Sequence, residues 1–379
     1  MKLFALTTLM LLYGISFAQE APTGSITGPA RAETARLAAL KGSVTGKIVW
    51  ASSRSGSRHD IWIMNADGTE QKQLTKSDHV DWYPRFSPDG RRILFTRSKS
   101  GWVGEGDAEI YDKWDLRLID LDGKGDTLAA QNAVWGTWRP SGDSIVFARG
   151  SKVFVKDLKS GDEREIFDAS AKLKKGAYAQ QPQLCADGTR LAVTIRGTHR
   201  ETGILNLSTG TWYSTGGGCQ MEWFPDGKKV LRMNEGQGNG GTEVLAINID
   251  AQGKPIDRVS GITIPKSIRF MDLPGRRSHE YFPRLDQTGT YLVWCATQYG
   301  HEHDIADYEV FIWKIGTDIK NGAVRLTFHS GNDRWPDLYT GEPAEASERD
   351  SAPVPVSEYS GAPSSGNAQP SDTVSGSLE

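Results

Sequence analysis

The chain has 379 residues, of which 24% are charged, and its formal net charge is −3. This length allows a large hydrophobic core, and the 42 glycines and 17 prolines indicate a fold rich in turns. The 44 basic residues are outnumbered by 47 acidic ones and form no long run. This distribution argues against nucleic acid as a partner, because binding to a polyanion depends on clustered positive charge.

The first 18 residues have the pattern of a secretory signal peptide. Lys2 precedes an apolar run from Leu3 to Ile15, and Ser16-Phe17-Ala18 places small residues around a cleavage point. The run is too short to span a membrane, so we expect no transmembrane span after cleavage. No cysteine follows the run, which leaves no lipobox, and we therefore predict a periplasmic or secreted protein.

Two segments flank the predicted folded body. Residues 19–44 form an N-terminal extension, in which 30–40 suits a short helix because Leu37 and Leu40 recur at helical spacing. Residues 340–379 consist mainly of Ser, Pro, Gly, Ala and acids, which bury too little apolar surface to fold. We expect a disordered tail there and a folded body over 45–339.

The body contains three cysteines, Cys185, Cys219 and Cys295. Export would permit a disulfide. The odd number and the lack of a metal-type spacing favour buried free thiols instead.

A unit of two β-hairpins recurs along the body. It is clearest from Asp60 to Arg97, where Asp67-Gly68 and Asp89-Gly90 each separate two strand-like runs. Glycine supplies the positive φ that a tight hairpin turn requires. The segment SPDGRRILF has counterparts in RPSGDSIVF, CADGTRLAV, FPDGKKVLR and DQTGTYLVW, and the five hairpin glycines are Gly90, Gly142, Gly188, Gly227 and Gly289.

The spacing of these units, 39 to 62 residues, lies within or near that of four-stranded propeller blades. The chain ends supply a sixth unit, because 46–50 fits a second strand and 333–339 fits an inner strand. Their pairing closes the ring and removes exposed sheet edges. The sequence therefore predicts an all-β fold, a six-bladed β-propeller of four-stranded antiparallel blades whose closing blade is shared between N- and C-terminal strands.

DIWIMNADG, which begins at Asp60, and WYPRFSPDGRRILF, which begins at Trp82, resemble the WD-like repeat of the TolB-like six-bladed β-propellers, a family of bacterial periplasmic and secreted proteins. The resemblance covers 45–339 and implies the fold. The family includes the Tol-Pal scaffold protein, propellers of certain serine peptidases and a lyase acting on oligogalacturonate, so the function stays open. The extension leaves no room for the amino-terminal α/β domain of TolB, and the chain has no G-x-S-x-G nucleophile motif.

One face of the predicted propeller is rich in histidine. Its loops join the second strand of a blade to the third, or one blade to the next, and the long loop from Ser98 to Trp114 could form a lid over it. All seven histidines lie in or beside such loops: His59, His79, His199, His279, His301, His303 and His329. Six of the seven belong to the fifth, closing and first blades, and we predict a ligand site in this sector.

Acidic residues recur in the same blades, three positions before a proline of the inner strand. They are Asp81, Glu280 and Asp333. These carboxylates could join the histidines in a ligand site. The alternative is structural, because a side chain at this position can cap the loop between blades by accepting backbone hydrogen bonds.

The densest polar stretch runs from Gln298 to Glu309. Imidazoles and carboxylates suit Zn, Mn or Fe, and His301 and His303 point the same way in an extended segment. The pattern Q-x-x-H-x-H resembles the Gln and two His that hold the metal in the oligogalacturonate lyases. One interpretation is a divalent metal, Mn or Zn, held by Gln298, His301, His303 and His279; the other is a hydrogen-bonded loop that anchors the blade.

We expect an exported TolB-like propeller, a monomer, that binds a protein or glycan in the cell envelope through the His- and acid-rich face. The alternative is a metal-dependent carbohydrate-active enzyme similar to a polysaccharide lyase, with arginines that pair with a uronate; whether the chain is an enzyme stays open. The residues expected to bind the ligand are His79, Asp81, Arg276, His279, Glu280, Tyr299, His301, His303, Asp304, His329, Asp333 and Arg334.

Overall fold

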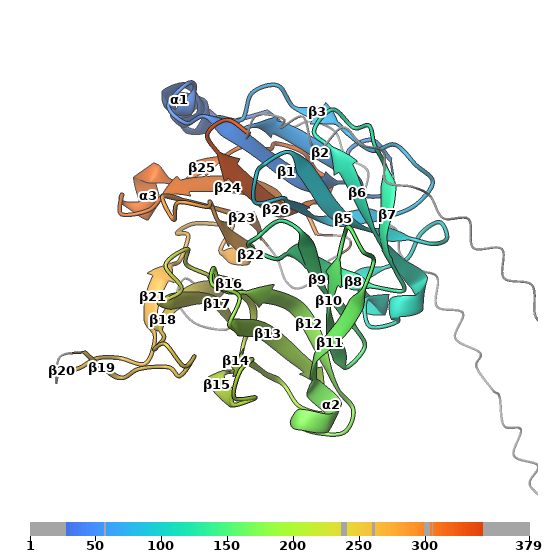
Figure 1. The fold of residues 1–379 in the computed structure, drawn as a ribbon. Helices are drawn as coiled ribbons and strands as arrows, with labels where there is room; N and C mark the ends of the chain where they lie inside the picture. Colours follow the sequence, from blue (N-terminus) through green and yellow to red (C-terminus); the bar gives the residue numbers. More distant parts are fainter. Residues whose placement is uncertain are drawn as a thin grey trace, which may run out of the picture. The chain divides into compact units, whose positions relative to one another are not determined.

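The computed structural model describes residues 28–56, 58–235, 241–259, 262–298, 304 and 306–343. The predicted signal peptide and most of the predicted tail lie outside these residues. The described chain forms six four-stranded antiparallel sheets that follow one another in chain order, together with one short hairpin (Figure 1). The predicted six-bladed β-propeller is confirmed.

The closing blade contains β26 (Asp333–Thr340), β1 (Gly46–Ser52), β2 (Asp60–Asn65) and β3 (Lys72–Gln73). The first blade contains β4 (Asp81–Phe86), β5 (Arg92–Ser98), β6 (Trp114–Asp120) and β7 (Thr127–Gln131). The second contains β8 (Val134–Trp138), β9 (Ser144–Arg149), β10 (Lys152–Asp157) and β11 (Glu163–Asp168).

The third blade contains β12 (Ala177–Leu184), β13 (Arg190–Gly197), β14 (Glu201–Asn206) and β15 (Trp212–Gly216). The fourth contains β16 (Cys219–Trp223), β17 (Lys229–Glu235), β18 (Thr242–Asn248) and β21 (Ile268–Met271). The fifth contains β22 (His279–Leu285), β23 (Tyr291–Thr297), β24 (Glu309–Lys314) and β25 (Val324–Arg325).

The hairpin glycines found in the sequence have the backbone conformation that the turn requires. Their φ angles lie between +65° and +77° at all five positions, a region that is costly for a residue with a Cβ atom. At the first of these turns, the Gly90 N–H donates to the Ser87 carbonyl at 2.8 Å. The repeated turn sets the register between the inner and second strands of five blades.

The second strands supply much of the core. Residues 48–50 of β1, 145–148 of β9 and 292–296 of β23 are completely buried. Both faces of these strands are covered because neighbouring blades pack against each other, and a strand buried on both faces is a continuous apolar run. Burial of each large apolar side chain stabilises the fold by roughly 1.5–3 kcal/mol.

The two ends of the described chain meet in the closing blade. β26 pairs antiparallel with β1, with Lys47 opposite Tyr339 and Ile48 opposite Leu338. This pairing closes the ring as the sequence predicted, so the inner strand of the blade comes from the end of the body and the other three come from its start.

The fourth blade departs from the repeat. A short hairpin of β19 (Arg258–Val259) and β20 (Ile262–Thr263) lies between β18 and the outer strand β21. This insertion lengthens the spacing from Gly227 to the next hairpin glycine, Gly289, to 62 residues, the longest spacing of the repeat.

Three helices accompany the propeller. The predicted N-terminal helix is present as α1 (Arg31–Leu40), and its Leu37 and Leu40 pack against the core cluster of the closing and fifth blades. α2 (Ala169–Lys172) follows β11, and α3 (Ile319–Gly322) follows β24. Each of these two short helices begins at an aspartate, Asp168 or Asp318, whose side chain accepts backbone hydrogen bonds.

The three cysteines are all buried and form no disulfide, as predicted. Within the described residues, no helix is long and apolar enough to cross a membrane.

Candidate functional site

Every inner strand contains the same backbone irregularity. One residue adopts a left-handed conformation with φ between 52° and 58°, and the pairing with the second strand shifts there. A residue other than glycine in this region is strained by about 1–3 kcal/mol, so its recurrence in every blade marks a β-bulge that is part of the architecture of the ring. The bulge residues are Tyr83, Trp135, Gln181, Gln220, Phe282 and Trp335, one in each blade.

The bulge residues of four blades are aromatic. They fill part of one end of the central channel of the propeller, which we call the channel mouth. The Tyr83 ring lies 4.9 Å from Trp135, and the Phe282 ring lies 5.7 Å from Trp335. Trp82 joins the two pairs, at 4.9 Å from Trp335 and 5.4 Å from Trp135. We call these five residues the aromatic sector, and all of them are buried.

The remaining two blades, the third and fourth, have Gln181 and Gln220 at the bulge. A cavity of about 610 Å³ lies beside these two side chains, a volume in the range of small-molecule pockets. We call it the channel-mouth cavity, and its remaining wall residues are Tyr178, Gln180, Arg196, Arg200, Cys219, Met233, Tyr281, Asp304, Glu105, Gly106 and Glu109. The channel mouth is therefore filled on its aromatic side and hollow on its polar side.

The loop between β5 and β6, which was predicted as a lid, forms one wall of this cavity. It contains two short 3₁₀ helices, Glu105–Asp107 and Tyr111–Lys113. The Glu105 carboxylate pairs with Arg334 of the closing blade at 2.8 Å, and the Glu105 N–H donates to Asp304 of the fifth blade at 3.0 Å.

The same lid also reaches the third blade, where the Gln180 amide donates to Glu109. The lid thus spans from the first blade to the closing, fifth and third blades. Contacts in three directions fix its position over the mouth.

Two polar groups of the third blade are available to a ligand. Gln181 is 6% exposed, and its Oε1 atom has no hydrogen-bond partner among the described residues. The exposed guanidinium of Arg200 likewise has no hydrogen bond or ion pair there, whereas Arg196 donates to the carbonyl of Gly218 at 3.1 Å. A buried acceptor without a donor is costly, so a ligand that donates to Gln181 and carries an anionic group would match this wall.

The lid side of the cavity is acidic, but burial weakens its charge. Burial raises the pKa of Asp304 to about 6, and the neighbouring Glu105 carboxylate acts in the same direction. Burial also raises the pKa of Glu109, against hydrogen bonds from Gln180 and Tyr178. Protonation of Asp304 below about pH 6 therefore removes one negative charge from this wall of the cavity.

Two histidines of the predicted sector are buried in the scaffold. His59 is fully buried, its Nε2 lies 3.0 Å from Asn332 Oδ1, and burial lowers its pKa to about 4. His329 is also buried, and its Nδ1 accepts the Gly331 N–H at 3.0 Å. These contacts hold the loop that enters β26.

The other histidines are dispersed. His79 is half-buried in the loop before β4, His279 is the first residue of β22, and His199 pairs with Glu201 at 2.8 Å on the third blade. His301, His303 and Tyr299 lie outside the described residues. The described histidines do not converge on the channel-mouth cavity.

The predicted acidic residues are completely buried and engaged in the scaffold. Both oxygens of Asp81 accept from Arg97 of the same blade, at 2.6 and 2.7 Å. Asp333 accepts from Trp50 Nε1 at 3.1 Å and from Arg54 at 2.8 Å. Each carboxylate therefore joins its inner strand to the second strand or to the loop after it.

Glu280 has the contacts of a cap. It accepts the Leu273 N–H, in the loop between the fourth and fifth blades, at 2.7 Å, and the Thr242 hydroxyl at 2.8 Å. Burial raises its pKa to about 8. These contacts fit the structural alternative that the sequence left open for the three acids.

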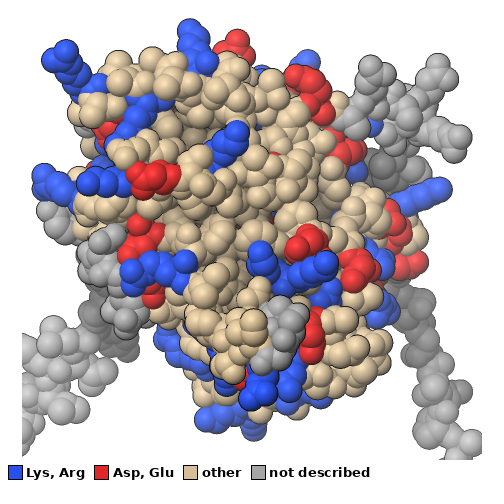
Figure 2. All heavy atoms as spheres, turned by 90° about the vertical axis from the view of Figure 1, so that its left-hand side faces the viewer, with Lys and Arg blue, Asp and Glu red and all other residues tan. Residues whose placement is uncertain are grey.

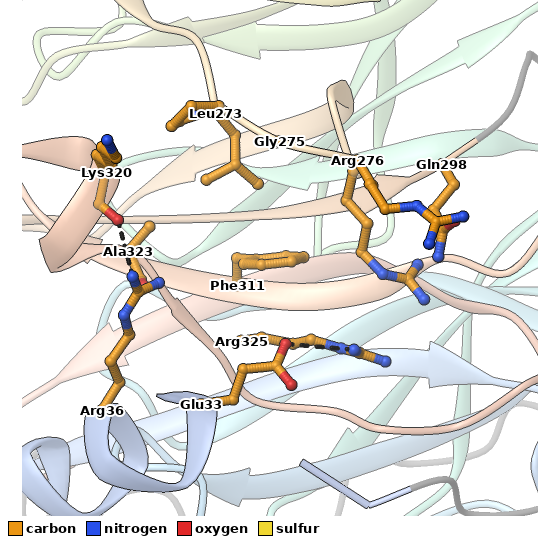
Figure 3. Close-up of a pocket in the computed structure, with 12 residues that line it drawn as sticks. Glu33, Arg36, Leu273, Gly275, Arg276, Gln298, Phe311, Lys320, Ala323 and Arg325 are labelled. Atoms are coloured by element: carbon orange, nitrogen blue, oxygen red, sulfur yellow. Dashed lines mark hydrogen bonds and ion pairs between the residues drawn. The ribbon is translucent and has the colours of Figure 1, made fainter. Parts of the chain in front are cut away.

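The two predicted arginines have different surroundings. Arg334 is fully buried, with its guanidinium 3.9 Å from the centre of the Trp335 ring, and it anchors the lid through Glu105. Arg276 is exposed and lies beside Gln298 in a groove on the outer flank of the fifth blade (Figure 3). The structure thus brings Arg334 and Asp304 to the lid, and Arg276 and Gln298 to this groove.

The predicted metal ligands are only partly described. His279 pairs with Thr297 across β22 and β23, and Gln298 follows directly after β23. Among the described residues, no group of three or more His, Cys, Asp or Glu side chains could hold a metal ion.

Two residues of the cavity wall that we did not predict, Gln181 and Gln220, had a signal in the sequence. The residue seven positions before each hairpin glycine is aromatic in the first, second and fifth blades, but it is Gln181 or Gln220 in the third and fourth. A polar residue at a position that is otherwise aromatic marks a place where the channel is not filled. Arg196 and Arg200 carried no comparable signal, because only the fold brings them to this place.

No protein-family model matches the chain. Two curated relatives are an uncharacterized protein of Agrobacterium fabrum, 32% identical over 113 residues, and a TolB homolog of Chlorobium luteolum, 27% identical over 184 residues. These alignments cover 27% and 47% of this chain, and 36% and 38% of the relatives. A Tol-Pal system protein TolB of Geobacter metallireducens is 41% identical over 59 residues, which are 16% of this chain and 14% of that protein.

Among solved structures, TolB from Acinetobacter baumannii superposes with a TM-score of 0.55 at 16% identity. The match covers 77% of this chain and 66% of that one. The chain therefore spans less than two thirds of the relatives and of this structure, and at this identity the superposition establishes the fold.

The fold, the repeat and these matches together define the class of protein. It is a six-bladed β-propeller with a lidded polar cavity at one end of its channel. The chain is similar to the TolB proteins and forms a TolB-like β-propeller, as the repeat in its sequence indicated.

Proposed function

We propose that this protein is an exported TolB-like propeller that binds a partner protein of the cell envelope through the lidded face of the channel. The observation that carries the proposal is the channel-mouth cavity, where Gln181 presents a buried acceptor without a donor and Arg200 an unpaired guanidinium. A partner segment that inserts a hydrogen-bond donor and a carboxylate would satisfy both groups.

Export rests on the sequence. Lys2, the apolar run and the small residues that end at Ala18 form the predicted signal peptide. The likeness to proteins named for the Tol-Pal system agrees with a place in the envelope. Sequencing of the mature N-terminus after expression in a bacterial host tests this part, and cleavage after Ala18 is the expected result.

The partner can be trapped at the cavity itself. A photo-cross-linking amino acid replaces Arg200 in one variant and Lys228, which is exposed in the hairpin turn between β16 and β17, in the control. Cross-linking in intact cells should give one dominant protein adduct from position 200 only. Equal adducts from both positions would contradict the proposal.

The trapped protein is then purified and its affinity measured by calorimetry. Arg200→Glu should weaken binding at least about tenfold, because it replaces an attractive charge by a repulsive one, and Lys228→Glu should leave it unchanged. If no protein binds and an envelope glycan binds with the same dependence on Arg200, the glycan alternative replaces the protein partner.

A second proposal follows from the Q-x-x-H-x-H pattern. The exposed Arg276 lies beside Gln298 in one groove, and an arginine next to the first residue of this pattern favours a metal-dependent carbohydrate-active enzyme whose substrate carries a carboxylate. Bound Mn or Zn would acidify a C–H next to a substrate carboxylate. Metal analysis of the purified protein decides: stoichiometric metal that is lost in His301→Ala/His303→Ala supports the enzyme, and a metal-free wild-type protein contradicts it.

A further inference from the structure

A second cavity lies on the outer flank of the fifth blade, away from the channel mouth. We call it the α1 groove: its volume is about 480 Å³, and its walls are α1, the loop between β21 and β22, and residues of β24, α3 and β25 (Figure 3). It shares no lining residue with the channel-mouth cavity. A ligand of this groove would therefore bind independently of the partner proposed above.

The wall made by α1 is held in place by side chains. Arg36 donates to the carbonyl oxygens of Lys320 at 3.0 Å and Ala323 at 3.4 Å. Glu33 pairs with Arg325 of β25 at 3.4 Å. These contacts join the helix to the fifth blade, so the groove is formed before any ligand arrives, which lowers the entropic cost of binding.

The lining of the groove is strongly basic. Five cationic side chains and one carboxylate face it: Arg36, Arg276, Arg277, Lys320, Arg325 and Glu33. Two of the cations have acidic partners, since Arg277 pairs with Asp307 at 2.7 Å and Arg325 also pairs with Glu309 at 2.5 Å.

The other three cations are not neutralised. Arg36 contacts carbonyl oxygens alone, and the exposed side chains of Arg276 and Lys320 have no hydrogen bond or ion pair within the described part of the chain. Three uncompensated positive charges on one groove favour an anionic ligand.

The three uncompensated charges stand at the two ends of the groove, and Phe311 and the ion pair of Glu33 and Arg325 lie between them. Figure 3 shows Lys320 and Arg36 at one end, Arg276 and Gln298 at the other, and the Phe311 ring in the middle. Phe311 is fixed by stacking on Trp294 at 5.5 Å between ring centroids. On this side of the molecule, Lys and Arg side chains, with some Asp and Glu among them, border a largely uncharged surface (Figure 2).

The positions of the charges and of Phe311 favour one class of anionic ligand over others. A single small anion would contact the cations of one end alone, Lys320 and Arg36 or Arg276, and would leave Phe311 and the other end uncovered. A polynucleotide needs a long basic track, which the chain lacks. An extended peptide with an apolar side chain between acidic ones matches both Phe311 and the ends, because hydrophobic burial and charge complementarity act together.

We propose that the α1 groove binds an acidic segment of a partner protein, in which an apolar side chain packs on Phe311 and the flanking carboxylates pair with Arg276 at one end and with Lys320 and Arg36 at the other.

The test uses a fluorescein-labelled peptide with blocked ends and a central phenylalanine flanked on each side by glutamates. Fluorescence anisotropy with the full chain should show saturable binding that weakens as salt rises. A matched peptide with glutamines in place of glutamates, and one with serine in place of phenylalanine, should each bind at least about tenfold more weakly. Equal binding of the glutamine peptide would overturn the proposal.

Two protein variants locate the site. Arg276→Glu/Lys320→Glu should weaken binding of the peptide at least about tenfold, while Lys228→Glu/Lys254→Glu, which makes the same change in net charge on exposed residues of the fourth blade, should keep wild-type affinity. Thermal unfolding of each variant checks that the fold is intact. Wild-type affinity in the Arg276→Glu/Lys320→Glu variant would place the peptide elsewhere and contradict the inference.

The same assay distinguishes the peptide from other anionic ligands. It also distinguishes the α1 groove from the channel-mouth cavity. Inorganic phosphate or vesicles of phosphatidylglycerol that bind through Arg276 and Lys320, without binding of the peptide, would overturn the proposal in favour of a phosphate-bearing ligand. Arg200→Glu should leave peptide binding unchanged, so a failure of the channel-mouth proposal does not affect this result.

Discussion

At the bulge position of the inner strands, four blades carry aromatic residues, and the third and fourth blades carry Gln181 and Gln220. The backbone is the same in both sectors, with φ between 52° and 58°. In the aromatic sector the side chains pack on one another, whereas in the polar sector they leave a cavity of about 610 Å³. The same β-bulge thus stabilises the ring where its side chain is apolar, and leaves space for a ligand where its side chain is polar.

The largest expected effect is the removal of a ring from the aromatic sector. Trp82 is 1% exposed and lies 4.5 Å from Trp114 and 4.9 Å from Trp335. Trp82→Ala should reduce the free energy of unfolding by about 3–5 kcal/mol, because it leaves a cavity in a packed core. Urea unfolding measures this loss, with Arg200→Ala of the polar sector as control, expected to change it by about 0.5 kcal/mol or less. Similar losses in the two variants would remove the distinction between the sectors.

The burial of His59 beside the aromatic sector predicts a dependence of stability on pH. His59 lies 5.3 Å from Trp335, and burial lowers its pKa from 6.5 to about 4. The unfolded chain therefore binds a proton more readily, so stability falls as the pH drops from 6.5 towards 4, by at most about 3 kcal/mol.

The control for this prediction is His59→Gln, which keeps a donor for Asn332 and cannot titrate. Unfolding of the two proteins is compared from pH 7.5 down to pH 4. The difference in unfolding free energy between them should change as the pH falls. A constant difference would show that His59 is not held neutral.

The alkylation rates of two cysteines give a second comparison between the cavity and the packed core. Cys219 lines the channel-mouth cavity, whereas Cys295 is fully buried and burial raises its pKa to about 12. Because the thiolate is the reactive form, native iodoacetamide alkylation should modify Cys219 at least about tenfold faster than Cys295. Peptide mapping by mass spectrometry gives both rates, and faster modification of Cys295 would contradict the described burial.

The fold could be predicted because its signals are local. The Asp-Gly turns around Gly68 and Gly90, and the apolar runs after them, depend on short-range backbone preferences that recur in every blade. The shared closing blade followed from the same pattern, since 46–50 and 333–339 each lacked one half of a unit. Only the fourth blade was obscured, because the β19–β20 hairpin interrupts it.

The candidate site was harder to predict because it depends on contacts between distant blades. The sequence pointed to the sector with most histidines, yet His59 and His329 are buried scaffold residues. Arg200 and Glu105 line the same cavity only because the lid crosses the channel mouth. The position of Gln181 in the repeat was visible in the sequence, but its meaning required knowing that this position faces the channel.

We infer that the polar side of the channel mouth, where the third and fourth blades carry Gln181 and Gln220, is kept open for a ligand at a cost in stability. Gln181→Leu tests it most directly, because it removes a buried acceptor without a partner and nearly preserves volume. In this variant the free energy of unfolding should rise by about 1 kcal/mol, while affinity for the partner trapped at position 200, measured by calorimetry, should fall at least about tenfold. A variant that is less stable and binds the partner with wild-type affinity would contradict it.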